Sequence, residues 1–169
     1  MLKSELVPSI SQDSIKDTVK KLAREIENDF EGEKLSIICP LKSHFMFCVD
    51  LMKEISLPQE LDFVFLSSPP NESVKVIKDA FINIRNKNIL IVTTVLDVGR
   101  SIYFLQNHLS LSYPKSIKLV TLFDKPTRRE LAISSDYTGY TVDDRFIVGY
   151  GLDINEQGRN YKELYNFSQ

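Results

Sequence analysis

The sequence has few of the residues that build metal clusters or disulfide frameworks. Its 169 residues include two cysteines, two histidines and no tryptophan. Cys39 ends an apolar run, Cys48 falls within a helical pattern, and neither His44 nor His108 has a partner at metal-ligand spacing. A fold stapled by disulfides and a zinc site are therefore both excluded as organising features.

The chain also lacks an excess of one charge and lacks long apolar runs. Its 21 lysines and arginines nearly balance 23 aspartates and glutamates, giving a formal net charge of -2. Nothing in this balance attracts nucleic acid, so any phosphate binding has to be local. No segment approaches the roughly 20 apolar residues of a membrane span, and the start lacks the apolar run of a signal sequence. We expect a soluble, cytoplasmic protein with no nucleic-acid or membrane partner.

Three segments place apolar residues at helical spacing. The first begins at Ser11, a suitable N-cap, and Gly32 is its stop signal. In the second, Phe45, Val49 and Met52 are expected on one apolar face. The predicted helices cover residues 11–30, 43–55 and 101–109.

Short apolar runs between these helices predict strands. The run NILIVTTV at 88–95 is the clearest of them. The predicted strands cover residues 35–39, 61–66, 74–77, 88–95, 117–123, 137–142 and 146–148. Strands that alternate with helices imply an α/β fold with a mostly parallel sheet, covered by helices on both faces. Since we find no repeat, low-complexity tract or linker, we expect a single domain over residues 1–169.

The most informative segment is Ile89–Ile102, in which an apolar strand runs into Asp97-Val98-Gly99-Arg100-Ser101 and then a helix. Gly99 permits a tight turn, and the amides at the helix start and the Ser101 hydroxyl are donors for a phosphate. Asp and Gly in such a turn also serve simply as a helix cap and a left-handed residue. The residues alone leave both interpretations open.

This segment resembles the signature of type I phosphoribosyltransferases, in which an apolar strand and two acidic residues lead to Asp-Thr-Gly-x-Thr/Ser. Other stretches follow in the order typical of the hypoxanthine-guanine branch. They are Pro40-Leu41-Lys42-Ser43 (Leu-Lys-Gly in the family), Leu122–Pro126 with Arg128-Arg129, and Phe146–Asp153 with Arg159-Asn160. The resemblance implies the type I phosphoribosyltransferase fold, with a small hood built from terminal segments. It also implies Mg²⁺ as cofactor and a homodimer or homotetramer.

The resemblance further implies a reaction and the residues for its phosphorylated substrate. Purine base and phosphoribosyl diphosphate would give a purine monophosphate and pyrophosphate. Asp97 would be the catalytic base that takes the proton from the attacking purine nitrogen. The residues implied for the ribose 5-phosphate are Asp97, Val98, Gly99, Arg100 and Ser101, and those for the pyrophosphate are Leu41, Lys42, Ser43 and Arg159.

The remaining motifs imply a purine site. Lys125 would donate to the 6-oxygen of hypoxanthine or guanine, Phe146 would stack on the ring, and the backbone of Ile147 would meet its edge. Asp153 would border the purine and hold Mg²⁺ near the pyrophosphate. Apart from the resemblance, Lys125 is also consistent with a solvated charge, Phe146 with a core residue and Asp153 with a turn residue.

Four departures from the family pattern fall on the ribose-diphosphate side. Thr93 and Thr94 replace the acidic pair that binds the ribose hydroxyls, so this ribose-binding pair is degenerate. Val98 replaces a threonine, Ser43 replaces a glycine, and the lid at 67–71 is shortened and lacks the usual tyrosine. Two main hypotheses follow: a weakened hypoxanthine-guanine phosphoribosyltransferase of purine salvage, or an impaired homologue that binds a purine nucleotide or a partner protein as a regulator. A transferase for another base is a third.

Overall fold

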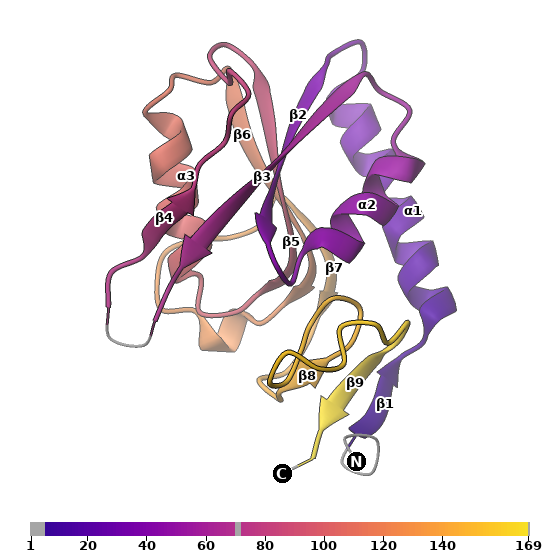
Figure 1. Ribbon diagram of the computed structural model, residues 1–169. Coiled ribbons are helices and arrows are strands. Elements are labelled where there is room, and N and C mark those ends of the chain that lie inside the picture. Colours follow the sequence, from indigo (N-terminus) through magenta and orange to yellow (C-terminus); the bar gives the residue numbers. More distant parts are fainter. Residues whose placement is uncertain (1–5, 70–71, 169) are drawn as a thin grey trace.

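The computed structural model describes residues 6–69 and 72–168, so Pro70 and Asn71 of the expected lid lie outside the described residues. A six-stranded sheet with the order β4-β3-β2-β5-β6-β7 forms the centre (Figure 1). All neighbours are parallel except β3 and β4. The strands are β2 (Leu35–Leu41), β3 (Gln59–Ser67), β4 (Lys75–Lys78), β5 (Asn88–Leu96), β6 (Ser116–Asp124) and β7 (Tyr137–Thr141). The predicted α/β fold with a mostly parallel sheet is confirmed.

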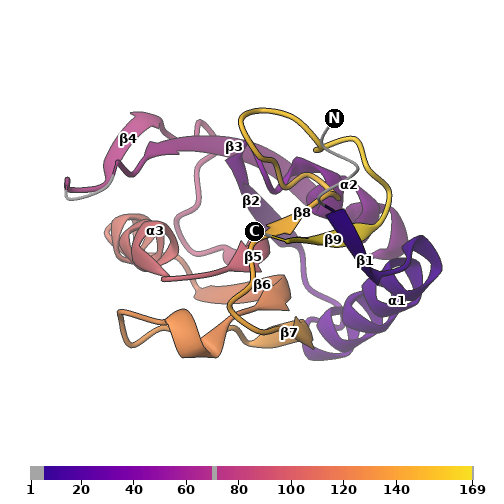
Figure 2. The same cartoon turned by 90° about the horizontal axis from the view of Figure 1, so that it is seen from below.

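Helices cover both faces of this sheet, as Figure 2 shows from below. They are α1 (Gln12–Asp29), α2 (Phe45–Glu54) and α3 (Arg100–Ser110). Alternate residues of β5 point to opposite layers: Leu90 and Val92 pack with α1 and α2, whereas Ile89 and Ile91 pack with α3. Because both faces are buried, β5 contains the unbroken apolar run Ile89–Val92. No helix in the described ranges is long and apolar enough to cross a bilayer.

The first helix forms as its sequence predicts. The Ser11 hydroxyl caps it by accepting a hydrogen bond of 3.2 Å from the Ser14 amide. Gly32 follows the helix with a φ of 75°, a conformation that favours glycine. The buried side of α1 consists of Ile15, Val19, Leu22, Ala23 and Ile26. This apolar stripe anchors α1 on the sheet.

The predicted helix is present as α2, but the face that carries Phe45, Val49 and Met52 is not its buried face. Phe45 and Val49 are 40% and 38% exposed, and Met52 is only partly buried. The side chains that α2 buries are Phe47, Cys48 and Leu51. Apolar residues surround much of this helix, so their spacing fits more than one face, and contact with the sheet decides which is buried.

A second, three-stranded antiparallel sheet joins the two ends of the described chain. Its order is β1-β9-β8, with β1 at Leu6–Ile10, β9 at Leu164–Phe167 and β8 at Ile147–Val148. Figure 1 shows this sheet below the carboxyl ends of the central strands. The expected hood of terminal segments is thus present. The apolar runs alone predicted neither β1 nor β9.

The hood faces the edge of the central sheet where ligands bind in parallel α/β folds. Leu96 at the end of β5 is paired in register with Asp124 at the end of β6. Leu41 ends β2 nearby, and the Leu41–Lys42 peptide bond is cis. The loops after these strands carry the predicted site residues.

Candidate active site at the carboxyl edge of the sheet

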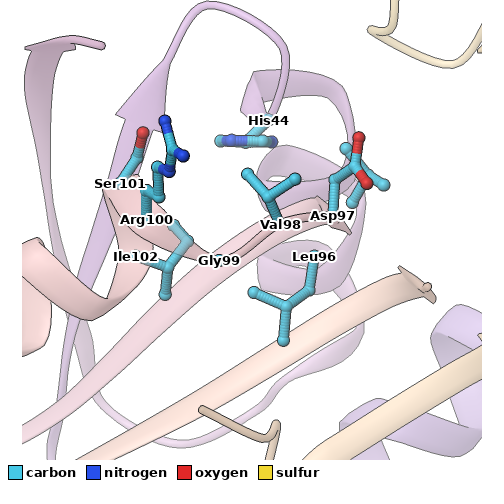
Figure 3. Close-up of a pocket in the computed structure, with 9 residues that line it drawn as sticks. His44, Leu96, Asp97, Val98, Gly99, Arg100, Ser101 and Ile102 are labelled. Atoms are coloured by element: carbon cyan, nitrogen blue, oxygen red, sulfur yellow. The ribbon is translucent and has the colours of Figure 1, made fainter. Parts of the chain in front are cut away.

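Residues 97–99 join β5 to α3, and together with Arg100 and Ser101 at the start of that helix they form the loop called 97–101 below (Figure 3). Gly99 has a φ of 90°, and a Cβ added there would lie 2.7 Å from Cγ2 of Ile133, so only glycine fits without displacement. The Tyr103 amide donates to the Gly99 carbonyl at the start of α3, and the amides before it are free of helical partners. The residues that carry these amides line a cavity of about 140 Å³, together with His44 and residues 95–98. This geometry suits an anion.

The loop is held in place by Arg129, whose side chain is only 12% exposed. Its guanidinium donates to the Leu96 carbonyl at 3.0 Å and to the Asp97 carbonyl, and it forms an ion pair with Asp124. Arg129 therefore fixes the backbone of the loop. The motif at 128–129 is recognisable in the sequence, but its supporting role depends on contacts that only the fold provides.

Asp97 lies where three cavities meet. It borders the phosphate-loop cavity, a cavity of about 430 Å³ that it shares with Lys125, and one of about 140 Å³ that it shares with Asp153. Its Oδ1 accepts a hydrogen bond of 2.5 Å from Nε of Arg128. The Asp97 carboxylate thus adjoins the predicted phosphate, base and pyrophosphate subsites together.

Lys125 is buried, with 4% of its surface exposed, so it is not the solvated charge that its sequence context also allowed. Its Nζ donates to the Arg145 carbonyl at 2.6 Å, and burial lowers the pKa of the ammonium group. An ammonium group has three hydrogens, so this hydrogen bond leaves donors for a ligand. The 430 Å³ cavity at its side is large enough for a bound base.

Two aromatic rings border the same cavity. Phe146 is half exposed, and Phe167 meets it edge to face, with ring centroids 6.2 Å apart and an interplanar angle of 74°. The Phe167 amide donates to the Phe146 carbonyl where β9 pairs with β8. The neighbouring Ile147 is buried. Phe146 is therefore a ligand-accessible ring and not a core residue, and Phe167 supports it from the hood.

The predicted pyrophosphate residues are tied together by ion pairs. Arg159 donates to the Ser43 hydroxyl at 2.9 Å and contacts Asp153 at 2.9 Å and Glu156 at 3.0 Å. Lys42 also contacts Glu156, at 2.9 Å. Hydrogen bonds from Lys42 and Arg159 lower the pKa of Glu156. Both cations expected to bind pyrophosphate thus share one carboxylate, which the sequence motifs do not single out.

Thr93 and Thr94 are fully buried. The Thr93 hydroxyl donates to the Val95 carbonyl at 2.8 Å, and the Thr94 hydroxyl donates to the Ser43 carbonyl at 3.1 Å. His44 lies over both of them: its Nδ1 accepts a hydrogen bond of 3.0 Å from the Thr94 amide. Burial, followed by the positive charge of Arg159, lowers the pKa of His44 to about 4. At neutral pH the imidazole is therefore uncharged.

The fold brings the sequence-predicted groups to one place. A single cavity is lined by Ser43, Val95, Asp97, Lys125, Phe146, Ile147, Leu152 and Asp153. Arg100 extends away from these groups to an ion pair of 2.5 Å with Glu130. Sequence reasoning missed His44 and Phe167. His44 directly follows the predicted pyrophosphate segment at 40–43, a position that could have pointed to it, whereas Phe167 has no local signal because strand pairing brings it to the site.

The residues present suit Mg²⁺ only when substrate supplies most of its ligands. Asp153 Oδ1 pairs with Arg159 and its Oδ2 accepts from the Glu156 amide at 2.8 Å. Within the part of the chain that the structure describes, no group of three or more His, Cys, Asp and Glu side chains could hold a metal ion. Mg²⁺ commonly retains waters and binds one carboxylate together with substrate phosphates, and Asp153 is suited to that role.

Known proteins share both sequence and fold with this chain. Residues 11–155 match the family model described as the phosphoribosyl transferase domain. The hypoxanthine-guanine phosphoribosyltransferase of Streptococcus thermophilus is 33% identical over 168 residues, covering 92% of this chain and 93% of that protein. The bifunctional protein TilS/HprT of Listeria innocua is 38% identical over 156 residues, or 89% of this chain, and the match spans 24% of its length.

A solved structure agrees with these sequence matches. The hypoxanthine-guanine phosphoribosyltransferase of Bacillus anthracis has a TM-score of 0.93 and 38% identity, covering 96% of this chain and 97% of that one. A hypoxanthine phosphoribosyltransferase from Staphylococcus aureus has a TM-score of 0.94 at 32% identity, covering 99% of this chain and 96% of that one. Together with the geometry of the site, these matches show that the chain belongs to the phosphoribosyltransferase family of enzymes, in its hypoxanthine-guanine branch.

Proposed function

We propose that the protein is a hypoxanthine-guanine phosphoribosyltransferase of purine salvage, which forms a purine monophosphate and pyrophosphate from the base and phosphoribosyl diphosphate. One observation carries this proposal: Asp97 borders the phosphate-loop cavity, the Lys125 cavity and the Asp153 cavity. A purine nitrogen bonds to C1 of the ribose, the bond from C1 to the pyrophosphate oxygen breaks, and Asp97 takes the purine proton.

The buried ammonium group of Lys125 supports recognition of a 6-oxopurine. Lys125 presents hydrogen-bond donors beside the accessible ring of Phe146, so a 6-oxygen gains a partner where the amino group of adenine would meet another donor. Phe146 supplies the stacking surface for the base. Recognition of hypoxanthine and guanine over adenine follows from this pair.

The phosphorylated substrate is proposed to occupy the rest of the site. Loop 97–101 binds the 5-phosphate, and Lys42, Ser43 and Arg159 bind the pyrophosphate. Mg²⁺, when bound with the pyrophosphate, neutralises charge on the leaving group, and Asp153 is the carboxylate proposed to contact it. The protein residues bind and orient both substrates and accept the proton.

Steady-state assays with hypoxanthine, guanine and xanthine, phosphoribosyl diphosphate and excess Mg²⁺ test the proposal. We expect turnover with at least one of these 6-oxopurines. Nucleotide binding by folded protein without turnover of any of these bases would contradict it and favour the regulatory alternative. The relatives bear the names of transferases and not of regulators, which supports the enzyme.

We further propose a single domain over residues 1–169, a cytoplasmic location, and assembly into a homodimer or homotetramer, as is typical of this family. Sedimentation velocity of the purified chain tests the assembly. A monomer throughout the micromolar concentration range would contradict it.

A further inference from the structure

His44 occupies a central place in the site, although no motif assigns it a role. It is the residue before α2, and its imidazole lines the same cavity as Asp97–Ser101. Figure 3 shows the ring facing the loop, with Arg100 and Ser101 to one side and Asp97 to the other. It is therefore placed beside any phosphorylated sugar that the loop binds.

The threonines beneath this ring cannot make the contact themselves. Each hydroxyl has one hydrogen, and those of Thr93 and Thr94 are donated to the carbonyls of Val95 and Ser43. Both residues are fully buried, and the Thr93 oxygen lies 3.4 Å from both nitrogens of His44. The imidazole is thus the polar group that this side of the site presents to the cavity.

Hydrogen bonding fixes which ring nitrogen carries the hydrogen. The Thr94 amide can only donate, and it donates to Nδ1 at 3.0 Å, so Nδ1 is unprotonated. A neutral imidazole then carries its hydrogen on Nε2. Because the lowered pKa keeps the ring neutral at pH 7, His44 offers one donor and no charge.

Building on the proposed function, we propose that His44 is a substrate-binding residue whose Nε2–H donates to an oxygen of the bound ribose 5-phosphate. A neutral donor needs no bridging cation to approach a phosphate or sugar oxygen, whereas a carboxylate would repel a phosphate. The consequence is that this contact to the phosphorylated sugar does not depend on Mg²⁺.

Calorimetry with ribose 5-phosphate in the presence of a chelator tests this inference. His44→Asn keeps an amide near the position of Nδ1 and loses the donor at Nε2, while His44→Gln keeps a donor near Nε2. We expect about tenfold weaker binding for His44→Asn, the size of a lost net hydrogen bond, and binding within about threefold of wild type for His44→Gln. Equal affinity of wild type and His44→Asn would overturn the inference.

His108→Gln is the matched control. His108 is the other histidine of the chain; it lies on α3, and its side chain pairs with Asp79. It should bind ribose 5-phosphate like wild type. Thermal unfolding of each variant separates loss of the contact from loss of the fold. A folded His44→Asn with reduced affinity supports the contact, and an equal reduction in His108→Gln would contradict it.

Nitrogen-15 NMR of labelled histidines provides a second readout. The His44 spectrum should show Nδ1 unprotonated and Nε2 protonated, with the Nε2–H signal moving when ribose 5-phosphate binds. Movement with inorganic phosphate as well would identify a phosphate oxygen as acceptor, and movement with the sugar phosphate alone would identify a sugar oxygen; both support the proposal. Calorimetric binding with no movement would overturn it.

These measurements separate the inference from the proposed function, because they need no purine base. Ribose 5-phosphate binding that depends on His44, without turnover of any base, would contradict only the proposed function. Turnover together with binding that ignores His44→Asn would contradict only the inference. Absence of ribose 5-phosphate binding by wild type would overturn the inference and the assignment of the phosphate loop.

Discussion

The base end and the pyrophosphate end of the site are built in different ways. At the base end, Lys125 is buried and fixed by one backbone carbonyl, and Phe146 presents half of its surface to a cavity of about 430 Å³. At the pyrophosphate end, Lys42 and Arg159 are both paired with Glu156. At the base end, Lys125 is held by a neutral carbonyl and has donors left for a ligand. At the pyrophosphate end, Lys42 and Arg159 are already paired with the carboxylate of Glu156.

The different construction of the two ends implies different contributions to substrate binding. A base entering the cavity beside Lys125 gains a hydrogen bond without breaking an ion pair in the protein. Pyrophosphate meets two cations that already pair with Glu156, so this carboxylate competes with it for their charge. We expect the base end to select the substrate and the pyrophosphate end to set how tightly the phosphorylated substrate is held.

The largest effect is expected where the two ends meet, at Asp97→Asn. The amide cannot accept the purine proton, so kcat should fall by ~10²–10⁴-fold, the usual contribution of a positioned base. Its similar size should leave binding of inosine monophosphate within a few-fold of wild type. Steady-state kinetics and calorimetry measure the two quantities, and an unchanged kcat would remove Asp97 from the chemistry.

The next largest effect is expected on the stability of the fold, from substitutions at the ribose side of the site. Thr93→Glu with Thr94→Asp would place two carboxylates at fully buried positions beneath His44. The free energy of unfolding should fall by ~3–5 kcal/mol, the scale of an uncompensated buried charge. Chemical denaturation measures it, and stability equal to wild type would show that the site opens readily to admit the acidic pair.

Adding His44→Gly to that double variant sharpens the test. Removing the imidazole gives the new carboxylates access to the cavity, so stability should recover in part and Mg²⁺-dependent turnover should exceed that of the double variant. The single His44→Gly variant is the control for the cavity itself. No recovery in either quantity would show that His44 is not what separates these positions from substrate.

The main strands and helices could be predicted because burial leaves a strong pattern. Both faces of β5 are covered, so its first half carries the unbroken apolar run Ile89–Val92. The hood strands could not be predicted in this way: β1 has exposed residues at Val7, Pro8 and Ser9, and its partner β9 lies at the other end of the chain. Pairing across such a separation leaves no periodic signal within either segment.

The same limit explains the site residues. Asp97, Gly99 and Lys125 lie in contiguous motifs whose chemistry can be read along the chain. His44 reaches Thr94 only because β2 and β5 are neighbouring parallel strands. Phe167 reaches Phe146 only through pairing of β9 with β8. Contacts made by the fold were inaccessible to reasoning from local patterns.

A smaller effect is expected from truncation at the base end. Lys125→Ala should weaken binding of inosine or guanosine monophosphate by about 1–3 kcal/mol, the scale of a hydrogen bond involving a charged group. Phe146→Ala should also weaken it through lost stacking. Lys115→Ala is the matched control, because Lys115 lies just before β6 and forms an exposed ion pair with Glu33. Calorimetry decides, and wild-type affinity in both site variants would mean that the base binds elsewhere.

The smallest effect is expected from Glu156→Gln, and it has the opposite sign. The variant removes the carboxylate that pairs with Lys42 and Arg159, so pyrophosphate meets two cations with no anionic competitor. Because the Glu156 side chain is 64% exposed, solvent screens both pairs, and we expect only about two- to fivefold tighter binding of pyrophosphate, measured by calorimetry. Glu31→Gln makes the same change in net charge before β2, at the opposite edge of the sheet, and should leave affinity unchanged. Weaker binding in Glu156→Gln would show that this carboxylate orients the cations for pyrophosphate, and that the ion pairs at this end serve preorganisation and not competition.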